Sequence, residues 1–450
     1  MLLVACDGDG PGKPPEGAFE ATITAGEPST IVVVSWTTEE PGTSKVEFGT
    51  SGAYGQVTPR GDELTTEHKV MVVGMPASTS CFLRPYSETA DGERLIGPAL
   101  TYETGSPPPA IALVYPDLVQ ADSTAPPILF TTVSTSSGVV IVNNQGQLLW
   151  WYAQPSTATG TQAYLSPDGL YVVFDSADSE HIDAEKSAIT RVRLDGGDTI
   201  VTYVPGGHHD FWELPTGGYA YVMADIRETD YGSDGTLDRV VGDAIVEVDL
   251  AGTLLRNVWS TWDWIPLREA ESSPFYPGAL DWTHVNGIYA DDEHYYVSSH
   301  NLNAIIAVRR DTGETAWQLG GDDSDFEFVG EAEQFVHQHS PRVSDGDVYL
   351  FNNTDGTGVP PSSYAVQLRP DMSAMTVDEV RRYAGDGESY SYVLGNLDVG
   401  PAGDWLVNWG TVGMIEDVAP DGTVATRFTT SIGFPVGNAH YAPDMGGPVP

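Results

Sequence analysis

The residues in this chain most suited to chemistry are its histidines. The chain has ten in 450 residues, and seven of them lie in four short segments of similar form. These segments read HHDFWELPTGG from His208, HVNGIYADDEH from His284, HQHSPRVSDGD from His337 and GNAHYAPDMGG around His440. Imidazole can act as a nucleophile, an acid–base group or a metal ligand near neutral pH. Its repeated placement therefore predicts one shared site.

The spacing within these segments predicts which side chains point the same way. Aligning the turns superposes His208 with His284 and His337, and Asp210 with polar residues in the other segments. Because strand side chains alternate faces, we expect one converging polar face, with His209 pointing away from it. The predicted face comprises His208, Asp210, His284, Asn286, His337, His339, Asn396, Asn438 and His440.

The elements that carry these residues repeat along the chain. Each unit reads as four strands over roughly 40 to 50 residues, which is typical of a propeller blade. We expect an all-β protein with a six-bladed β-propeller over 126–450. The first strand of each blade lines the channel, and 436–444 completes the blade begun by 126–153. The insertion 262–282 could shape or cover the site. Complete blades are expected at 161–203, 208–259, 283–319, 337–383 and 390–430.

The segment 17–104 reads as short alternating strands without a helix signal. VVVSWTTEEPGTSKVEFG, which contains Trp36, and STSCFLRPYSE, which contains Cys81, resemble strands of a fibronectin type III sandwich. We expect this module to space or position the propeller, with a linker over 105–125.

The first sixteen residues resemble an export signal. Cys6 closes Leu-Leu-Val-Ala-Cys, which is similar to the lipobox of bacterial lipoproteins, and a polar Gly/Pro-rich tether follows it. We expect an exported protein held in the bacterial envelope by a lipid on Cys6, with no other membrane contact. Lipidation of Cys6 would leave Cys81 unpaired.

The formal net charge of −44, with 20 basic residues, argues against nucleic-acid binding, because phosphate contacts need clustered Lys and Arg. The same charge would repel an anionic substrate at long range, so local donors would have to attract it. The oligomeric state is left open.

At these motifs, over roughly 120–445, the chain resembles the bacterial arylsulfotransferase family, enzymes that move sulfuryl groups between phenols without a nucleotide donor. The resemblance rests on the HHDFWELPTGG and HQHSPRVSDGD segments, on DWTHVNGIYADDEHYYVSSHNLNAIIAV and on the late NWG. It implies a small aryl sulfate and a phenol as substrates and no cofactor. It also implies that His339 is a nucleophile that becomes transiently sulfated, supported by His284 and the His208/His209 pair.

One position departs from the family pattern. His300, in VSSHNL, stands where the family commonly has an arginine that would stabilise charge on the transferred group. Either a protonated His300 replaces it, or the propeller has changed its substrate or lost catalysis. Trp282, beside His284, or Tyr276 in the insertion could stack on an aromatic acceptor.

Two other functions fit the same residues. A histidine-rich metal site has suitable ligand types in His208, Asp210, His284 and the His337/His339 pair. A catalytically silent propeller lipoprotein, acting in ligand binding or adhesion, would also tolerate the change at His300.

Overall fold

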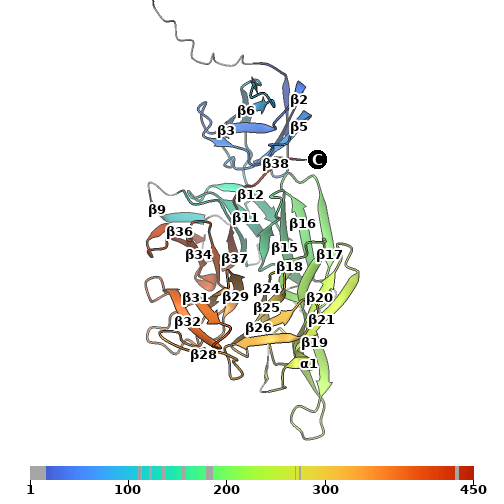
Figure 1. The fold of residues 1–450 in the computed structure, drawn as a ribbon, viewed down its shortest axis with the longest axis vertical. Helices are drawn as coiled ribbons and strands as arrows, with labels where there is room; N and C mark the ends of the chain where they lie inside the picture. The colour runs from blue at the N-terminus through green and yellow to red at the C-terminus, as the bar shows by residue number, and fades with distance from the viewer. Residues whose placement is uncertain are drawn as a thin grey trace, which may run out of the picture.

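The computed structural model describes residues 17–449 apart from 110, 112–113, 121–123, 134–137, 155–157, 179–185, 269, 273–274 and 431–434. Cys6 lies outside the described residues, so its role stays a prediction. The described chain is built from β-sheets, and its only helical turns are α1 (Thr261–Trp264) and η1 (Gly410–Val412). Within it, no helix is long and apolar enough to cross a membrane. Figure 1 shows a small blue β-domain at one end of a larger ring of sheets.

The N-terminal domain consists of two sheets over one core. Val32, Val34 and Trp36 on one sheet pack against Phe48 and Leu83 on the other. The fibronectin type III assignment stays a prediction. The first sheet has the order β1 (Ala21–Ala25), β2 (Val32–Gly42), β5 (Thr65–Val72), β38 (Gly447–Pro448). The second has β4 (Gln56–Val57), β3 (Lys45–Gly49), β6 (Ser80–Glu88) and β7 (Arg94–Ile96), with β8 (Leu100–Glu103) also on β6.

The rest of the described chain contains six sheets that share a four-strand antiparallel path. One sheet joins β14 (Ala163–Leu165), β15 (Tyr171–Asp178), β16 (Ala188–Arg193) and β17 (Thr199–Tyr203). The next joins β18 (Gly207–Glu213), β19 (Tyr219–Thr229), β20 (Asp238–Val248) and β21 (Leu254–Ser260). A third joins β24 (Val285–Ala290), β25 (His294–Ser299), β26 (Ala304–Arg309) and β27 (Thr315–Leu319).

The remaining three sheets follow the same path. β29 (His339–Ser344), β30 (Asp347–Asn352), β31 (Tyr364–Asp371) and β32 (Thr376–Tyr383) form one. β33 (Asn396–Val399), β34 (Trp405–Asn408), β35 (Met414–Val418) and β36 (Val424–Thr430) form the next. β37 (Val436–Tyr441), β10 (Ile128–Thr132), β11 (Gly138–Val142) and β12 (Leu148–Ala153) form the last. Short strands extend four of the sheets: β13 (Ala158–Thr159), β22 (Glu271–Ser272) with β23 (Leu280–Asp281), β28 (Glu327–Phe328), and β9 (Val114–Val119).

Apolar cores join these sheets into a propeller. Each core takes side chains from two neighbouring sheets, as where Val222 and Ile245 meet Val297 and Ile306. Equivalent shared cores connect the other pairs around the ring. The first strands of the sheets contact one another, β18 with β24, β24 with β29, β29 with β33, and β33 with β37, so they surround the channel.

The ends of the propeller sequence meet in one sheet. β37 pairs with β10 in antiparallel register from Ile128–Tyr441 to Thr132–Val436, as the two complementary half-units predicted. Two domain boundaries are corrected. β9, within the expected linker, pairs with β36 as an outer strand, and β38, expected in the propeller, pairs with β5 of the N-terminal domain. In both cases a sheet edge offers unpaired backbone groups that a nearby segment satisfies.

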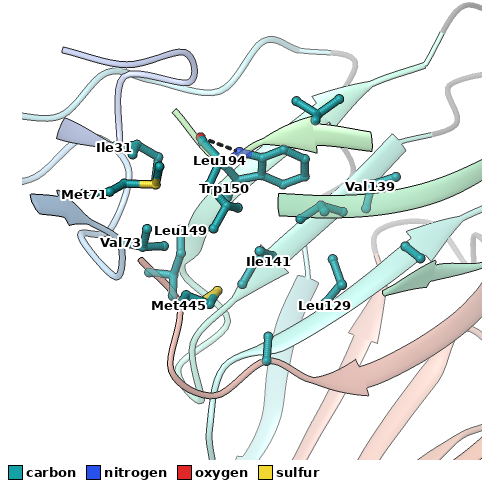
Figure 2. Close-up of a cluster of buried hydrophobic side chains, with 14 of the residues drawn as sticks. Ile31, Met71, Val73, Leu129, Val139, Ile141, Leu149, Trp150, Leu194 and Met445 are labelled. Atoms are coloured by element: carbon teal, nitrogen blue, oxygen red, sulfur yellow. Dashed lines mark hydrogen bonds between the residues drawn. The ribbon is translucent and has the colours of Figure 1, made fainter. Parts of the chain in front are cut away.

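The two domains share a continuous apolar core. Ile31 and Met71 of the N-terminal domain lie in one cluster with Leu149 and Trp150 of the propeller and Met445 of the C-terminal segment (Figure 2). Trp150 Nε1 donates to the carbonyl of Leu194 in the neighbouring sheet at 2.9 Å. The N-terminal domain is therefore packed onto the propeller and is not a freely hinged spacer.

Candidate active site

Six histidine rings gather where the first strands begin. Neighbouring ring centroids lie between 4.3 and 6.1 Å apart. The contacts form a chain in which each ring packs on the next, in the order His208, His209, His284, His300. The His300 ring also packs on both His337 and His339. We call this group the histidine cluster, and the end of the channel that holds it the histidine mouth. The register argument predicted the convergence of His208, His284, His337 and His339. His300 was implicated only by the family resemblance, and for His209 the resemblance and the register argument disagreed.

His209 joins the cluster because the strand alternation fails at this point. Its φ is +60°, and the pairing of β18 with β19 shifts between Gly207 and Phe211. His284 and His337 also have positive φ, at +46° and +57°. This conformation is uncommon for residues with a Cβ, and it turns consecutive side chains toward one region. The prediction that His209 points away is therefore wrong.

His339 is held in one tautomer. Asn353 donates through Nδ2 to the carbonyls of Ser391 and Leu394, both at 2.8 Å, so its Oδ1 faces His339 Nδ1 at 2.7 Å. An amide oxygen only accepts, so His339 Nδ1 carries the proton. Nε2 then holds the lone pair, and it accepts from the Leu394 N–H at 3.3 Å. Burial lowers the pKa of His339 to about 4, which leaves the ring neutral and nucleophilic at pH 7.

Sequence reasoning missed Asn353. It lies just after β30, at the end of a second strand, whereas the register argument considered only first strands. Ser299 and Asn408 occupy comparable ends of β25 and β34. A search for polar residues at these ends, VSSH, FNN and VNW, would have found it.

His284 is the member of the cluster whose charged form is favoured. Its Nδ1 lies 2.6 Å from Asp281 Oδ2. Burial disfavours the charged ring, but the contact with Asp281 and the charges of Asp281 and Asp243 outweigh burial and raise the pKa of His284. The structure thus places a histidine suited to be an acid in the same cluster as His339, whose ring is neutral.

Asp243 supports the other end of the cluster. His208 Nε2 lies 3.0 Å from Asp243 Oδ1, and His208 Nδ1 lies 2.7 Å from His209 Nδ1. Asp243 Oδ2 accepts from the Thr283 hydroxyl at 2.5 Å and the Val285 N–H at 2.9 Å. Burial would raise the pKa of Asp243, but these contacts lower it. Burial and the positive charge of His284 hold the pKa of His209 well below its usual value.

His300 does not replace the expected arginine as a cation. Burial, with the charges of His284 and His339, lowers the pKa of His300 to about 3. Its Nδ1 lies 2.9 Å from Asn301 Oδ1, and its ring stacks on His337 at 4.3 Å with an interplanar angle of 4°. Of the two alternatives left open for His300, burial therefore disfavours the protonated ring, and among the described residues no carboxylate contacts it as Asp281 contacts His284.

The predicted inner polar residues connect neighbouring strands instead of contacting the histidine rings. Asp210 Oδ2 accepts from the Ile288 N–H at 3.0 Å. Asn286 Nδ2 donates to the Gln338 carbonyl at 2.9 Å, and Asn396 donates to the Ala439 carbonyl at 2.7 Å. Asn438 contacts Gln162 in the next sheet. These four residues satisfy backbone and side-chain groups between sheets, and so hold the first strands around the channel.

Two predicted residues lie away from the cluster. His440 is four residues into β37, roughly 13 Å along the strand from its start. Its ring packs 4.8 Å from Tyr164, and its Nδ1 lies 3.6 Å from Asp398 Oδ2. Trp282 is 1% exposed and packs edge-to-face on Trp262 at 5.0 Å. Neither side chain has the surroundings of a substrate contact at the histidine mouth.

The insertion does reach the site, through Tyr276, which the sequence had offered as the alternative to Trp282, and through Phe275, which it had not. Phe275 is 47% exposed, and its ring lies 6.4 Å from His209 and 6.1 Å from His284. Tyr276 lies 6.3 Å from His208. Phe275 offers the exposed aromatic surface that was expected of Trp282.

Within the described parts of the chain, no group of three or more His, Cys, Asp or Glu side chains is arranged to hold a metal ion. The histidine rings contact one another edge-on or stacked, whereas ligands of one ion would point their nitrogens at a common centre.

A model of the arylsulfotransferase (ASST) family matches residues 116–432. No curated protein matches. Solved structures are similar at low identity. A protein of unknown function from Bacteroides caccae shows 12% identity and a TM-score of 0.45, covering 70% of this chain and 98% of that one. A nidogen/laminin complex shows 9% identity and a TM-score of 0.43, and the match covers 71% of this chain and 99% of that one. A catalytically inactive virginiamycin B lyase from Staphylococcus aureus with quinupristin shows 14% identity and a TM-score of 0.36, and the match covers 70% of this chain and 88% of that one.

Proposed function

The chain belongs to the arylsulfotransferase family, and we propose that it moves a sulfuryl group from an aryl sulfate ester to a phenolic acceptor through a sulfohistidine at His339. The observation that carries this proposal is the fixed tautomer of His339, which leaves a lone pair on Nε2. The same cluster holds His284, whose charged form is favoured. A neutral nucleophile suits an anionic sulfate ester, which would repel a carboxylate.

In the first half-reaction, His339 Nε2 attacks sulfur, the N–S bond forms and the S–O(aryl) bond breaks. The leaving phenolate takes a proton from the His284 imidazolium, whose charge is sustained by Asp281. Nδ1 keeps its proton, so the sulfated ring carries one positive charge against the sulfuryl negative charge. The Leu394 N–H already faces Nε2 and would donate to a sulfuryl oxygen there.

The second half-reaction is the reverse with a new phenol. The acceptor oxygen attacks sulfur, the N–S bond breaks, and neutral His284 takes the phenolic proton. One residue thus serves as acid and then as base. His209, held neutral and backed by His208 and Asp243, does not compete with His284 for the proton.

The test uses an aryl sulfate with a chromogenic phenol, first without acceptor. Wild-type protein should release up to one phenol per chain and gain the mass of one SO3 group on the peptide that contains His339. His339→Asn should show neither, whereas His440→Asn, which alters a histidine outside the cluster, should show both. Release of phenol without a sulfated peptide would contradict the covalent route.

A catalytically silent binding propeller remains the second candidate, because His300 stands in the place of the family's arginine and does not supply its charge. His300→Arg separates the two. If wild-type protein is inert and folded His300→Arg protein is inert as well, the binding function is favoured. Turnover by wild-type protein excludes it.

A further inference from the structure

A cavity of about 640 Å³ lies between the N-terminal domain and the propeller. Loop 49–57 forms one wall, the turn between β11 and β12 forms the second, and the C-terminal segment around Asp444 and Met445 forms the third. The histidine cluster contributes nothing to it. Its size is within the range of small-molecule sites, which favour junctions between domains.

The loop that presents Tyr54 to this cavity has an unfavourable backbone conformation. Tyr54 has a φ of +61°, which a bulky residue rarely adopts. A Cβ at Gly49 would lie 1.6 Å from the Tyr54 carbonyl oxygen, so glycine is required there for the loop to close. The Arg84 guanidinium lies 4.6 Å from the Tyr54 ring centroid and is itself fixed by Glu47 at 2.8 Å. Such strain is concentrated at functional positions.

Four of the polar side chains that line the cavity are amides, and the Thr50 and Thr124 hydroxyls line it as well. Gln56, Asn143, Asn144 and Gln147 line it. Asn143 Nδ2 donates to Gln147 Oε1 at 2.9 Å, which orients the Gln147 NH2 group as a donor. An amide donates and accepts, as a sugar hydroxyl does. Among the described lining residues there is no Lys, Arg or His, and Asp444 is the one carboxylate.

We propose that this cavity, the junction site, binds a neutral saccharide unit, with the apolar face of the sugar ring on Tyr54 and its hydroxyls on Gln56, Asn144 and Gln147. The absence of cations among its described lining residues and the net charge of −44 disfavour an anionic ligand. Four amides against one carboxylate favour a neutral ligand over a cationic one. Because both domains line the site, the ligand would stabilise their contact.

The experiment titrates the full chain with maltose and cellobiose by calorimetry, with glucuronic acid and glucosamine as anionic and cationic probes. At least one neutral disaccharide should bind saturably and raise the melting temperature. Tyr54→Asn removes the ring while asparagine tolerates the positive φ, and it should weaken binding by about tenfold or more. Tyr203→Asn, at a tyrosine that is 60% exposed on β17, is the matched control and should leave affinity unchanged.

His339→Asn should also leave affinity unchanged, so loss of sulfuryl transfer and loss of sugar binding are separate results. If Tyr54→Asn does not fold, Gln56→Ala, which alters an exposed side chain on the same wall, should give the same weakening. The proposal is overturned if neither disaccharide binds saturably, if a charged probe binds more tightly, or if the folded Tyr54 or Gln56 variant binds as well as wild type.

Discussion

Asn353→Asp should raise the acid limit of activity, which is the pH below which donor cleavage is lost. The substitution keeps an oxygen beside His339 Nδ1, at the position where the amide oxygen lies 2.7 Å away, but gives it a negative charge. A contacting opposite charge typically raises a histidine pKa by about 1 to 3 units. The pKa of His339, about 4 in the native protein, would then lie at roughly 5 to 7.

The consequence for the nucleophile follows from its protonation. With a pKa of about 4, His339 is almost wholly neutral at pH 5.5, whereas a pKa near 6.5 would leave roughly a tenth of it neutral. Donor cleavage by Asn353→Asp at pH 5.5 should therefore be roughly tenfold slower than at pH 8, while wild type shows no such loss from this group. The measurement is single-turnover phenol release between pH 4 and pH 8.

A control separates the charge from general damage. Asn353 is fully buried, and its Nδ2 donates to two carbonyls. Loss of these bonds should cost about 1 to 3 kcal/mol each, so melting curves are needed at every pH. Asn352→Asp alters the neighbouring buried amide, whose Oδ1 accepts only backbone N–H groups among its described bonds, and should leave the acid limit in place. A folded Asn353→Asp protein with the wild-type acid limit would refute the assignment of the tautomer.

Two further predictions rest on the structure and one on the sequence. Asp281→Asn should remove the carboxylate that raises the pKa of His284. The His284 imidazolium would then lose its proton at a lower pH, so the activity of the variant should fall at a lower alkaline pH than that of wild type. An unchanged alkaline limit in the pH–activity profile would contradict the acid role of His284. Met71→Ala should lower the free energy of unfolding by about 2 to 5 kcal/mol. Because Met71 lies in the core shared by the two domains, calorimetry should show both domains melting in one transition at a lower temperature than in wild type. Two separate transitions would contradict that coupling. We propose that Cys6 carries a lipid, and Cys6→Ser should release the protein from host membranes on fractionation; unchanged fractionation would refute the anchor.

Turn spacing and strand alternation were enough to predict the propeller, its closure and the convergence of the histidines. His208, His284 and His337 could be placed because they occupy the same position before a turn, and His339 because it lies two residues later on the same face of its strand. The closing sheet could be placed because 126–153 lacks a first strand that 436–444 supplies, and β37 indeed pairs with β10.

What failed depends on local backbone geometry and on long-range partners. A positive φ at His209 breaks the alternation on which the parity argument relied. His440 satisfies that parity but lies further along its strand than the histidines of the cluster, since alternation predicts a face and not a depth. Asp243 comes from the middle of β20, so only the folded chain brings it to His208. Asp281 lies three residues before His284, and their contact depends on the local backbone, which strand alternation does not describe.

The direction of the first strands has a consequence for how the molecule could be mounted. β14 runs toward the turn at Gly169, whose carbonyl accepts from Gly446 of the C-terminal segment docked on the N-terminal domain. The cluster lies at the opposite ends of these strands, and Figure 1 shows the N-terminal domain at one end of the molecule with α1 toward the other end. Residues 17 and 449 both belong to that base. Coupling the protein to a bead through either terminus would present the histidine mouth outward, away from the support.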